Sequence, residues 1–221
     1  MHNFLHILKA IDTELLDFII LYGKQIYFIL FIIIFAKTAF VVLTFLPGDA
    51  TLFASGAIAA TGHLNLQLLF IIFFIATVAG DAQNYFIGNR FALLSKKTKK
   101  YPLGKIISDS SVEKTSTFLL NYGNLAIFFS RFIPLLSTTL PFLSGYTKYS
   151  FQRFFTYNAT GALLWTLTWV GTGYLVGNFT WVSDHLSISL VFITLLSFIP
   201  PSIAFTIEYL KKKRADSSVE A

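Results

Sequence analysis

The chain has 221 residues, of which 55% are hydrophobic and only 13% are charged. Because a soluble domain has charge on roughly a quarter of its residues, this composition excludes a disordered, collagen-like or ordinary water-soluble protein and indicates an integral membrane protein. The net charge of +6 does not indicate a nucleic-acid partner, since the lysines form short clusters beside apolar segments, as at the flanks of membrane spans. The chain has no cysteine and four scattered histidines, so we expect no disulfide, no metal site and no cofactor.

Residues 1–17 lack the basic start, apolar run and small-residue cleavage site of a secretory signal peptide. Their apolar side chains recur near helical spacing, which predicts an amphipathic segment lying on the membrane surface. The alternative is that these residues are the solvated start of the first span, and the sequence favours neither.

Between residues 18 and 210 the sequence is mostly apolar except for one polar loop, 91–115, which has six lysines and two acidic residues. A helix needs about 20 mostly apolar residues to cross a membrane. The tail, 211–221, begins with three lysines and an arginine. Because lysine and arginine remain on the cytoplasmic side, we predict a multi-pass protein of the inner (plasma) membrane with a cytoplasmic loop and cytoplasmic N- and C-termini. The predicted spans are 18–36, 65–90, 154–177 and 187–210.

Segment 116–147 starts at the cytoplasmic loop and ends beside Lys148, which belongs on the same side. It contains Pro134 and Pro141, and proline removes a backbone donor and breaks a helix. A broken helix at membrane depth is tolerated where the backbone is buried in protein or lines a wet cavity. We therefore predict a re-entrant hairpin that enters from the cytoplasm, with Gly145 as a further breaker.

Segment 38–62 starts and ends on the outer side by the same reasoning, and it has Pro47, Gly48 and Asp49 in its middle. We predict a second re-entrant hairpin, entering from the opposite face. A Phe-x-Pro triplet followed by Ser-Gly occurs in both hairpins, which favours an inverted repeat with its binding site near the midplane. The predicted fold is therefore all-α, a polytopic membrane protein with two oppositely oriented re-entrant helical hairpins. The alternative is one ordinary span per apolar window.

Arg131 is the most informative single residue, because a charge at the centre of a membrane helix costs about 3 kcal/mol on insertion scales. It should face the protein interior and pair with another group. One interpretation is a buried ion pair with Asp49 or Asp81 that locks the hairpins. We favour the other, an arginine in a wet cavity that binds phosphate oxygens, because buried ion pairs seldom add net stability.

Four other polar residues are candidates for the same site. Asp49 either caps the helix that follows it or serves as a proton or ion site at the midplane. Asp81 lies on a polar face with Asn84, where a helix–helix hydrogen bond is the preferred interpretation. The hydroxyls of Ser137 and Thr138 either bind a lipid head group or satisfy broken backbone.

Several motifs resemble those of the DedA family of bacterial membrane proteins, which is related to the SNARE-associated or VTT-domain proteins of eukaryotes. The resemblance covers about residues 25–214. The motifs are Phe-Leu-Pro-Gly-Asp at 45–49, Gly-Asp-x-x-x-Tyr-x-x-Gly at 80–88, Phe-x-Arg-Phe-Ile-Pro at 129–134 and Asn-x-x-Gly-Ala-x-x-Trp at 158–165.

The resemblance implies that charges within the membrane couple transport to the proton gradient. Asp49 and Arg131 match the family pattern. Lys37 stands where the best-studied members have a glutamate, and Ser137 stands where the motif has a second arginine. These two departures predict weak coupling, with Lys37, Asp49 and Asp81 as ion-coupling or structural charges.

The sequence has no phosphate-binding loop, no zinc-protease motif and no Ser-His-Asp set, so we do not expect an enzyme. The resemblance implies a lipid transporter, flippase- or scramblase-like, that moves undecaprenyl phosphate or a related anionic lipid across the bilayer. A homo-oligomer is compatible with this interpretation. The alternative is a proton- or cation-coupled transporter of small solutes that supports membrane and pH homeostasis.

Overall fold

The computed structural model describes residues 22–43, 48–97, 117, 119, 122–133 and 136–179, and every regular element within these ranges is helical. This confirms the all-α prediction for the described part of the chain. The elements are α2 (Gln25–Ala39), η1 (Val41–Leu43), α3 (Gly48–Ala60), α4 (Leu66–Lys97), η3 (Ser130–Phe132), α6 (Leu136–Tyr146) and α7 (Phe151–Gly177). Outside the described residues lie Pro47, Pro134, the predicted amphipathic segment 1–17, the span 187–210 and the tail 211–221.

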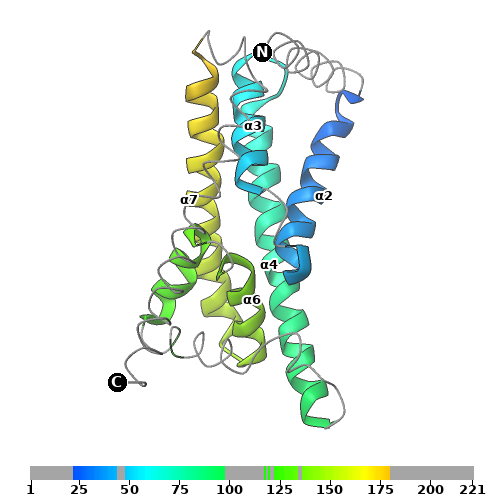
Figure 1. Cartoon of the computed structure of the whole chain (residues 1–221), viewed down its shortest axis with the longest axis vertical. Coiled ribbons are helices and arrows are strands. Elements are labelled where there is room, and N and C mark those ends of the chain that lie inside the picture. The colour runs from blue at the N-terminus through cyan, green and yellow to red at the C-terminus, as the bar shows by residue number, and fades with distance from the viewer. Residues whose placement is uncertain are drawn as a thin grey trace, which may run out of the picture.

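Helices α4 and α7 are the long elements of the molecule and extend along most of its length (Figure 1). They have 32 and 27 residues, or about 48 and 40 Å at 1.5 Å per residue. By length and composition Leu66–Leu94 of α4 is suited to cross a membrane, and α2 is apolar but shorter. Helix α4 includes residues 91–97 of the predicted loop, because this stretch is rich in Ala, Leu and Lys, which favour helix.

The first interrupted element consists of α2, η1 and α3. Helix α2 ends where Phe40 adopts an extended conformation, with φ −126° and ψ 117°. Helix α3 then returns toward the end of the molecule from which α2 came (Figure 1). With 15 residues, α2 is about 22 Å long, less than the roughly 30 Å of membrane hydrocarbon. The descending arm is therefore α2, and the predicted hairpin 38–62 contains only the break and the returning arm. The backbone N–H of Asn65 donates to Tyr27 Oη at 2.7 Å, so α2 begins at the end where α3 finishes. Contrary to the prediction, 18–36 is thus not a separate span, and residues 38 and 62 do not lie at the same end.

The second interrupted element lies at the opposite end of the molecule (Figure 1). Residues 122–129 are helical, η3 follows, and Ile133 is extended with φ −109° and ψ 112°. Helix α6 then runs through both Pro141 and Gly145, so neither residue breaks the helix, contrary to the prediction. Pro141 removes only one backbone donor, for the carbonyl of Ser137, and Gly145 provides close packing instead. Whether the two elements are re-entrant in a bilayer stays a prediction.

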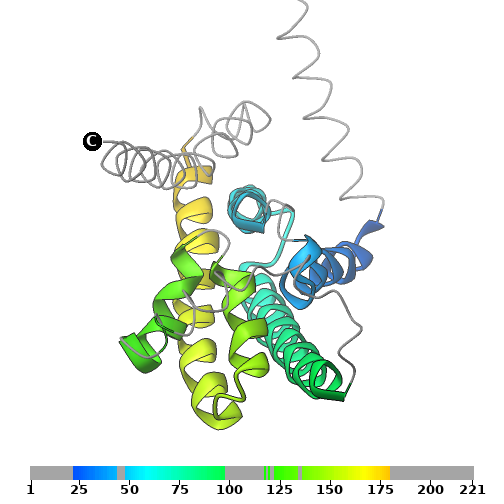
Figure 2. The ribbon, with the colours of Figure 1, turned by 60° about the horizontal axis from the view of Figure 1, so that its bottom comes forward.

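Each returning arm packs against the long helix of the other half of the chain. Helix α3 lies along α7, where Gly56 meets the backbone of Val170 and Gly173 meets that of Phe53. Helix α6 lies along α4, where Gly145 faces the backbone of Tyr85. Small residues at such contacts let helices approach closely within a membrane. Figure 2 shows α3 between α7 and α2, so the two halves of the chain form one bundle.

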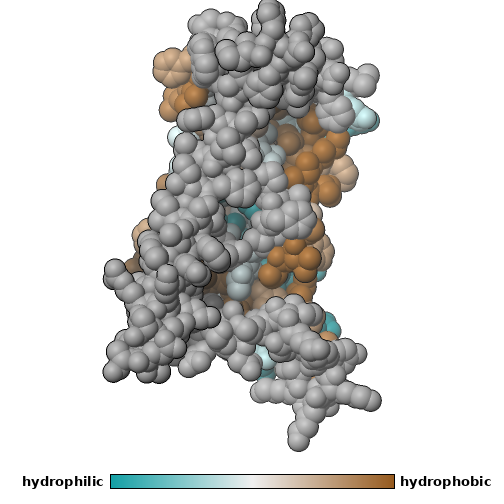
Figure 3. Space-filling model, in the orientation of Figure 1, coloured by the Kyte–Doolittle hydropathy of each residue, from teal (hydrophilic) through white to brown (hydrophobic). Residues whose placement is uncertain are grey.

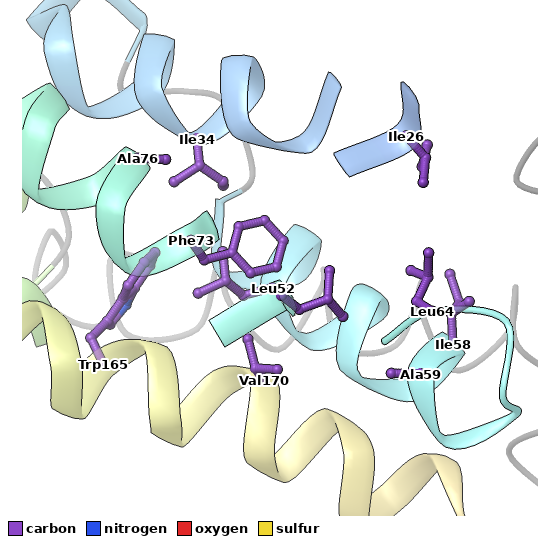
Figure 4. Packing of buried hydrophobic residues seen from close by; sticks show 11 residues of the cluster. Ile26, Ile34, Leu52, Ile58, Ala59, Leu64, Phe73, Ala76, Trp165 and Val170 are labelled. Carbon is purple, nitrogen blue, oxygen red and sulfur yellow. The ribbon is translucent and has the colours of Figure 1, made fainter. Parts of the chain in front are cut away.

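The main apolar core lies where α2, α3, α4 and α7 meet. Figure 4 shows Ile34, Leu52, Phe73 and Val170 converging from these four helices. The outer surface is also apolar, with Phe28 68% exposed and other large hydrophobic side chains exposed on α4 and α7. Figure 3 shows this apolar surface over the α2 side of the molecule. An apolar exterior around buried polar groups is the arrangement expected of a protein in lipid.

Candidate functional site

Arg131, Asp81 and Asn158 form a buried triangle between three elements. Arg131 lies on η3, Asp81 on α4 and Asn158 on α7. The Arg131 guanidinium forms an ion pair with Asp81 through Nη2 and Oδ2, and its Nη2 donates to Asn158 Oδ1 at 2.8 Å. Asn158 Nδ2 in turn donates to Asp81 Oδ2 at 3.1 Å. The side chains of Arg131 and Asp81 are only 3% and 0% exposed, so this pair is sealed from the surroundings.

The triangle uses only part of its hydrogen-bonding capacity. Asp81 Oδ1 and Arg131 Nε are buried and have no hydrogen-bond partner among the described residues. The ion pair therefore joins one nitrogen to one oxygen, whereas an arginine and a carboxylate can form two parallel bonds. A partly satisfied buried polar network is costly. This arrangement is expected where a site must accept another group.

Lys37 and Asp49 form a second ion pair, which is more open. Lys37 lies in the last turn of α2 and Asp49 in the first turn of α3. The Lys37 Nζ and Asp49 Oδ1 atoms are 3.9 Å apart, and the two side chains are 12% and 32% exposed. The indole nitrogen of Trp165, on α7, donates to the same Asp49 oxygen at 3.1 Å. The first break is thereby tied to α7, as the second break is tied to α4.

Trp165 lies beside both cations. The ring centroid is 5.6 Å from Lys37 Nζ and 5.8 Å from Arg131 Cζ, which is within the range of a cation–π interaction. The Lys37–Asp49 pair and the Arg131–Asp81 pair therefore both lie beside the Trp165 ring. At 3% exposure, Trp165 is a core residue and not the interfacial anchor that tryptophan often provides.

Asn84 links the two interrupted elements. Its Nδ2 donates to the carbonyl of Thr38, at the end of α2, at 3.2 Å and to the carbonyl of Thr138, in α6, at 2.8 Å. Gly80, one turn earlier on α4, leaves room for the Thr38 side chain. Helix α4 thus holds both breaks from one polar face, on which Asp81 also lies.

The structure divides the predicted charges into two pairs. Arg131 pairs with Asp81, and Asp49 pairs with Lys37. Ser137 is half-buried at the start of α6 and Thr138 is buried beside it, so both lie next to the second break. A head-group role for their hydroxyls stays a prediction. Within the described ranges no cluster of three His, Cys, Asp or Glu residues is suited to hold a metal ion.

Sequence reasoning did not assign a site role to Asn158 or Trp165. The two residues are seven positions apart on α7, which is about two helical turns, so they face the same side of the helix. That spacing is the signal in the sequence. The two residues can be recognised as site residues only once η3 and α3 are placed against α7. Asn158 then bonds to Arg131 at the second break, and Trp165 bonds to Asp49 at the first.

A helical bundle with an apolar exterior and an ion pair at each of two helix breaks is typical of a membrane protein, and the comparisons with known proteins agree. A family model described as VTT domain matches residues 46–175. Protein DedA of Escherichia coli (strain K12) is 38% identical over 207 residues, which cover 93% of this chain and 91% of that protein. The chain belongs to the DedA family of VTT-domain membrane proteins, as its motifs predicted.

More distant relatives also carry membrane names. Inner membrane protein YghB of Escherichia coli (strain K12) is 27% identical over 171 residues, which cover 77% of each chain. An uncharacterized membrane protein of Mycobacterium leprae (strain TN) is 27% identical over 189 residues, covering 85% of this chain and 82% of that protein. No solved structure matches the chain. These names support a membrane location for this protein.

Proposed function

We propose that this protein is a transporter that moves an anionic lipid across the inner membrane, with undecaprenyl phosphate as the favoured substrate. The observation that carries the proposal is the pair of cations, Lys37 and Arg131, at the two breaks of a bundle with an apolar exterior. Charges within a membrane domain commonly mark a substrate pathway. Helix breaks near the midplane are where such transporters bind their substrates.

Arg131 keeps one donor, Nε, that no described residue uses and that a phosphate can engage. Its guanidinium contacts Asp81 through Nη2 alone, while Nε has no partner within the described part of the chain. A phosphate has three oxygens and can engage both nitrogens of this edge, which a planar guanidinium favours. A head group would therefore replace one anion by another without leaving Arg131 unpaired.

In this proposal the hydrocarbon chain of the lipid does not pass through the interior of the protein. Val42 is 78% exposed at the first break, Phe28 is 68% exposed near the start of α2, and Leu175 is 66% exposed at the far end of α7. Apolar helix surfaces of this kind allow the chains to remain in the bilayer while the head group passes through protein. We also propose opposed re-entrant hairpins, with the loop 91–115 and the C-terminus cytoplasmic and residue 22, at the start of α2, on the outer side, and a transport step without enzymatic chemistry.

Reconstitution into vesicles tests the proposal directly. A fluorescent polyprenyl phosphate is placed in both leaflets, and a membrane-impermeant reductant then bleaches whatever reaches the outer one. We expect nearly complete bleaching with the protein and about half in protein-free vesicles, because only the outer leaflet is accessible there. Proton or cation flux without lipid movement would contradict the proposal and favour the solute transporter.

A further inference from the structure

We propose that Lys37 is the first ligand of the phosphate group, which binds at the junction of α2 and α3 before it reaches Arg131. The ligand class is a phosphate monoester or inorganic phosphate. The inference rests on the proposed function only for the lipid attached to that phosphate. It assigns to Lys37 a binding role in addition to its ion pair.

The ammonium group of Lys37 has hydrogen-bonding capacity left for a ligand. An ammonium has three donors, and that of Lys37 makes no hydrogen bond to the described residues. Its one ion pair, to Asp49, spans 3.9 Å, which is longer than a hydrogen bond. Its other neighbour is the Trp165 ring, whose centroid lies 5.6 Å from Nζ. The charge is thus attracted from two sides and bonded to neither.

Gly48 holds the lysine in this position by leaving it room. A Cβ atom added at Gly48 would lie 2.6 Å from Lys37 Cδ and 2.9 Å from Cε. The lysine side chain therefore lies directly over the first residue of α3, and its ammonium is at the start of that helix.

Asp49 remains bonded when a phosphate takes its lysine. Trp165 Nε1 donates to Asp49 Oδ1 at 3.1 Å, and the Asp49 side chain is 32% exposed. By contrast, a phosphate that displaces Asp81 from Arg131 strands a carboxylate that is fully buried. Asp81 would keep only the hydrogen bond from Asn158, and a carboxylate that is fully buried loses more on separation from its cation than one that is partly exposed. The phosphate should therefore bind first at Lys37.

Calorimetry on the purified full-length chain in detergent tests the inference. The probes are farnesyl phosphate, inorganic phosphate and farnesol, so that the head group and the apolar tail are measured separately. We expect Lys37→Met to weaken farnesyl phosphate binding about tenfold or more, the equivalent of one charge-assisted hydrogen bond. Lys148→Met is the matched control, because it removes the same charge from an exposed turn. The affinity of this variant for farnesyl phosphate should stay within about twofold of that of the unmodified protein.

A second variant covers the case in which Lys37→Met folds poorly. Lys37→Met combined with Asp49→Asn removes both charges of the pair and should bind as weakly as the single variant. Unchanged affinity in either variant, or absence of phosphate binding by the unmodified protein, would overturn the role of Lys37. A farnesol affinity as high as that of farnesyl phosphate would do the same.

The two proposals fail in different ways. Lipid movement in vesicles together with unchanged affinity of Lys37→Met overturns the Lys37 site and leaves the transporter standing. Phosphate binding through Lys37 without lipid movement has the opposite meaning. If inorganic phosphate binds as tightly as farnesyl phosphate and loses affinity equally in Lys37→Met, the site stands and its ligand is free phosphate.

Discussion

Arg131 is held by residues from two helices that are distant in sequence, and its chemistry depends on that environment. Asp81 balances its charge, and Asn158 bonds to both of them. This explains why residue type alone left its partner open between Asp49 and Asp81. Only the position of η3 beside α7, which brings Arg131 to Asp81 on α4, decides between these two carboxylates.

Replacement of Arg131 separates its structural role from its binding role. Arg131→Ala leaves the buried Asp81 unpaired, so we expect a loss of about 3–5 kcal/mol in the free energy of unfolding. Arg131→Ala combined with Asp81→Asn should recover most of that stability and still fail to move lipid. Thermal unfolding in detergent and the vesicle assay measure the two effects. Lipid movement by the double variant would mean that Arg131 only balances Asp81.

Lys37 and Ser137 predict weak dependence of transport on the proton gradient. In the unmodified chain Lys37 and Asp49 compensate each other, so neither needs to exchange a proton. Lys37→Glu would place two carboxylates together, which disfavours ionisation of both, and Ser137→Arg would restore a cation nearby. We expect this double variant to lose transport when an uncoupler is added, while the unmodified protein continues. Abolition of transport by the unmodified protein under the uncoupler would refute this expectation.

The interrupted helices are the elements in which sequence patterns and structure agree only in part. Helix α7 matches the predicted span 154–177 closely and α4 contains nearly all of the span 65–90 before continuing to Lys97, because long apolar stretches define both. Pro141 was expected to break a helix that in fact continues through it. Packing decides that case, since Gly145 allows α6 to lie close against α4. The sequence shows which residues are small enough for such a contact, but it does not show which residues of the other helix they meet.

The contact of α6 with α4 should not tolerate a methyl group. In Gly145→Ala the new Cβ would lie 2.8 Å from the carbonyl carbon of Tyr85, so we expect a loss of about 1–3 kcal/mol from overpacking. Gly171→Ala is the matched control, because a Cβ at that position meets nothing within 4 Å. It should leave stability unchanged or raise it by up to about 1 kcal/mol. Equal unfolding temperatures for both variants would argue against close packing at Gly145.

The molecule as a whole has two ends, and cysteine labelling can assign them to the two sides of the membrane. His63 and Asn178 lie at the end where α3 and α7 finish, whereas Ser150 starts α7 at the other end (Figure 1). The native chain has no cysteine, so the assay has no background. We expect His63→Cys and Asn178→Cys to react with an impermeant reagent in intact cells, and Ser150→Cys only after permeabilisation. Labelling of Ser150→Cys in intact cells would contradict the predicted topology.

The two hydrogen bonds that Asn84 donates constrain how the bundle can move. Its amide has two hydrogens, and one is given to Thr38 in the first interrupted element and the other to Thr138 in the second. Neither break can draw away from α4 without stranding a buried donor. We therefore expect the two breaks to move together, so that a displacement of one is accompanied by a displacement of the other. We expect exposure toward one leaflet and closure toward the other to form a single step.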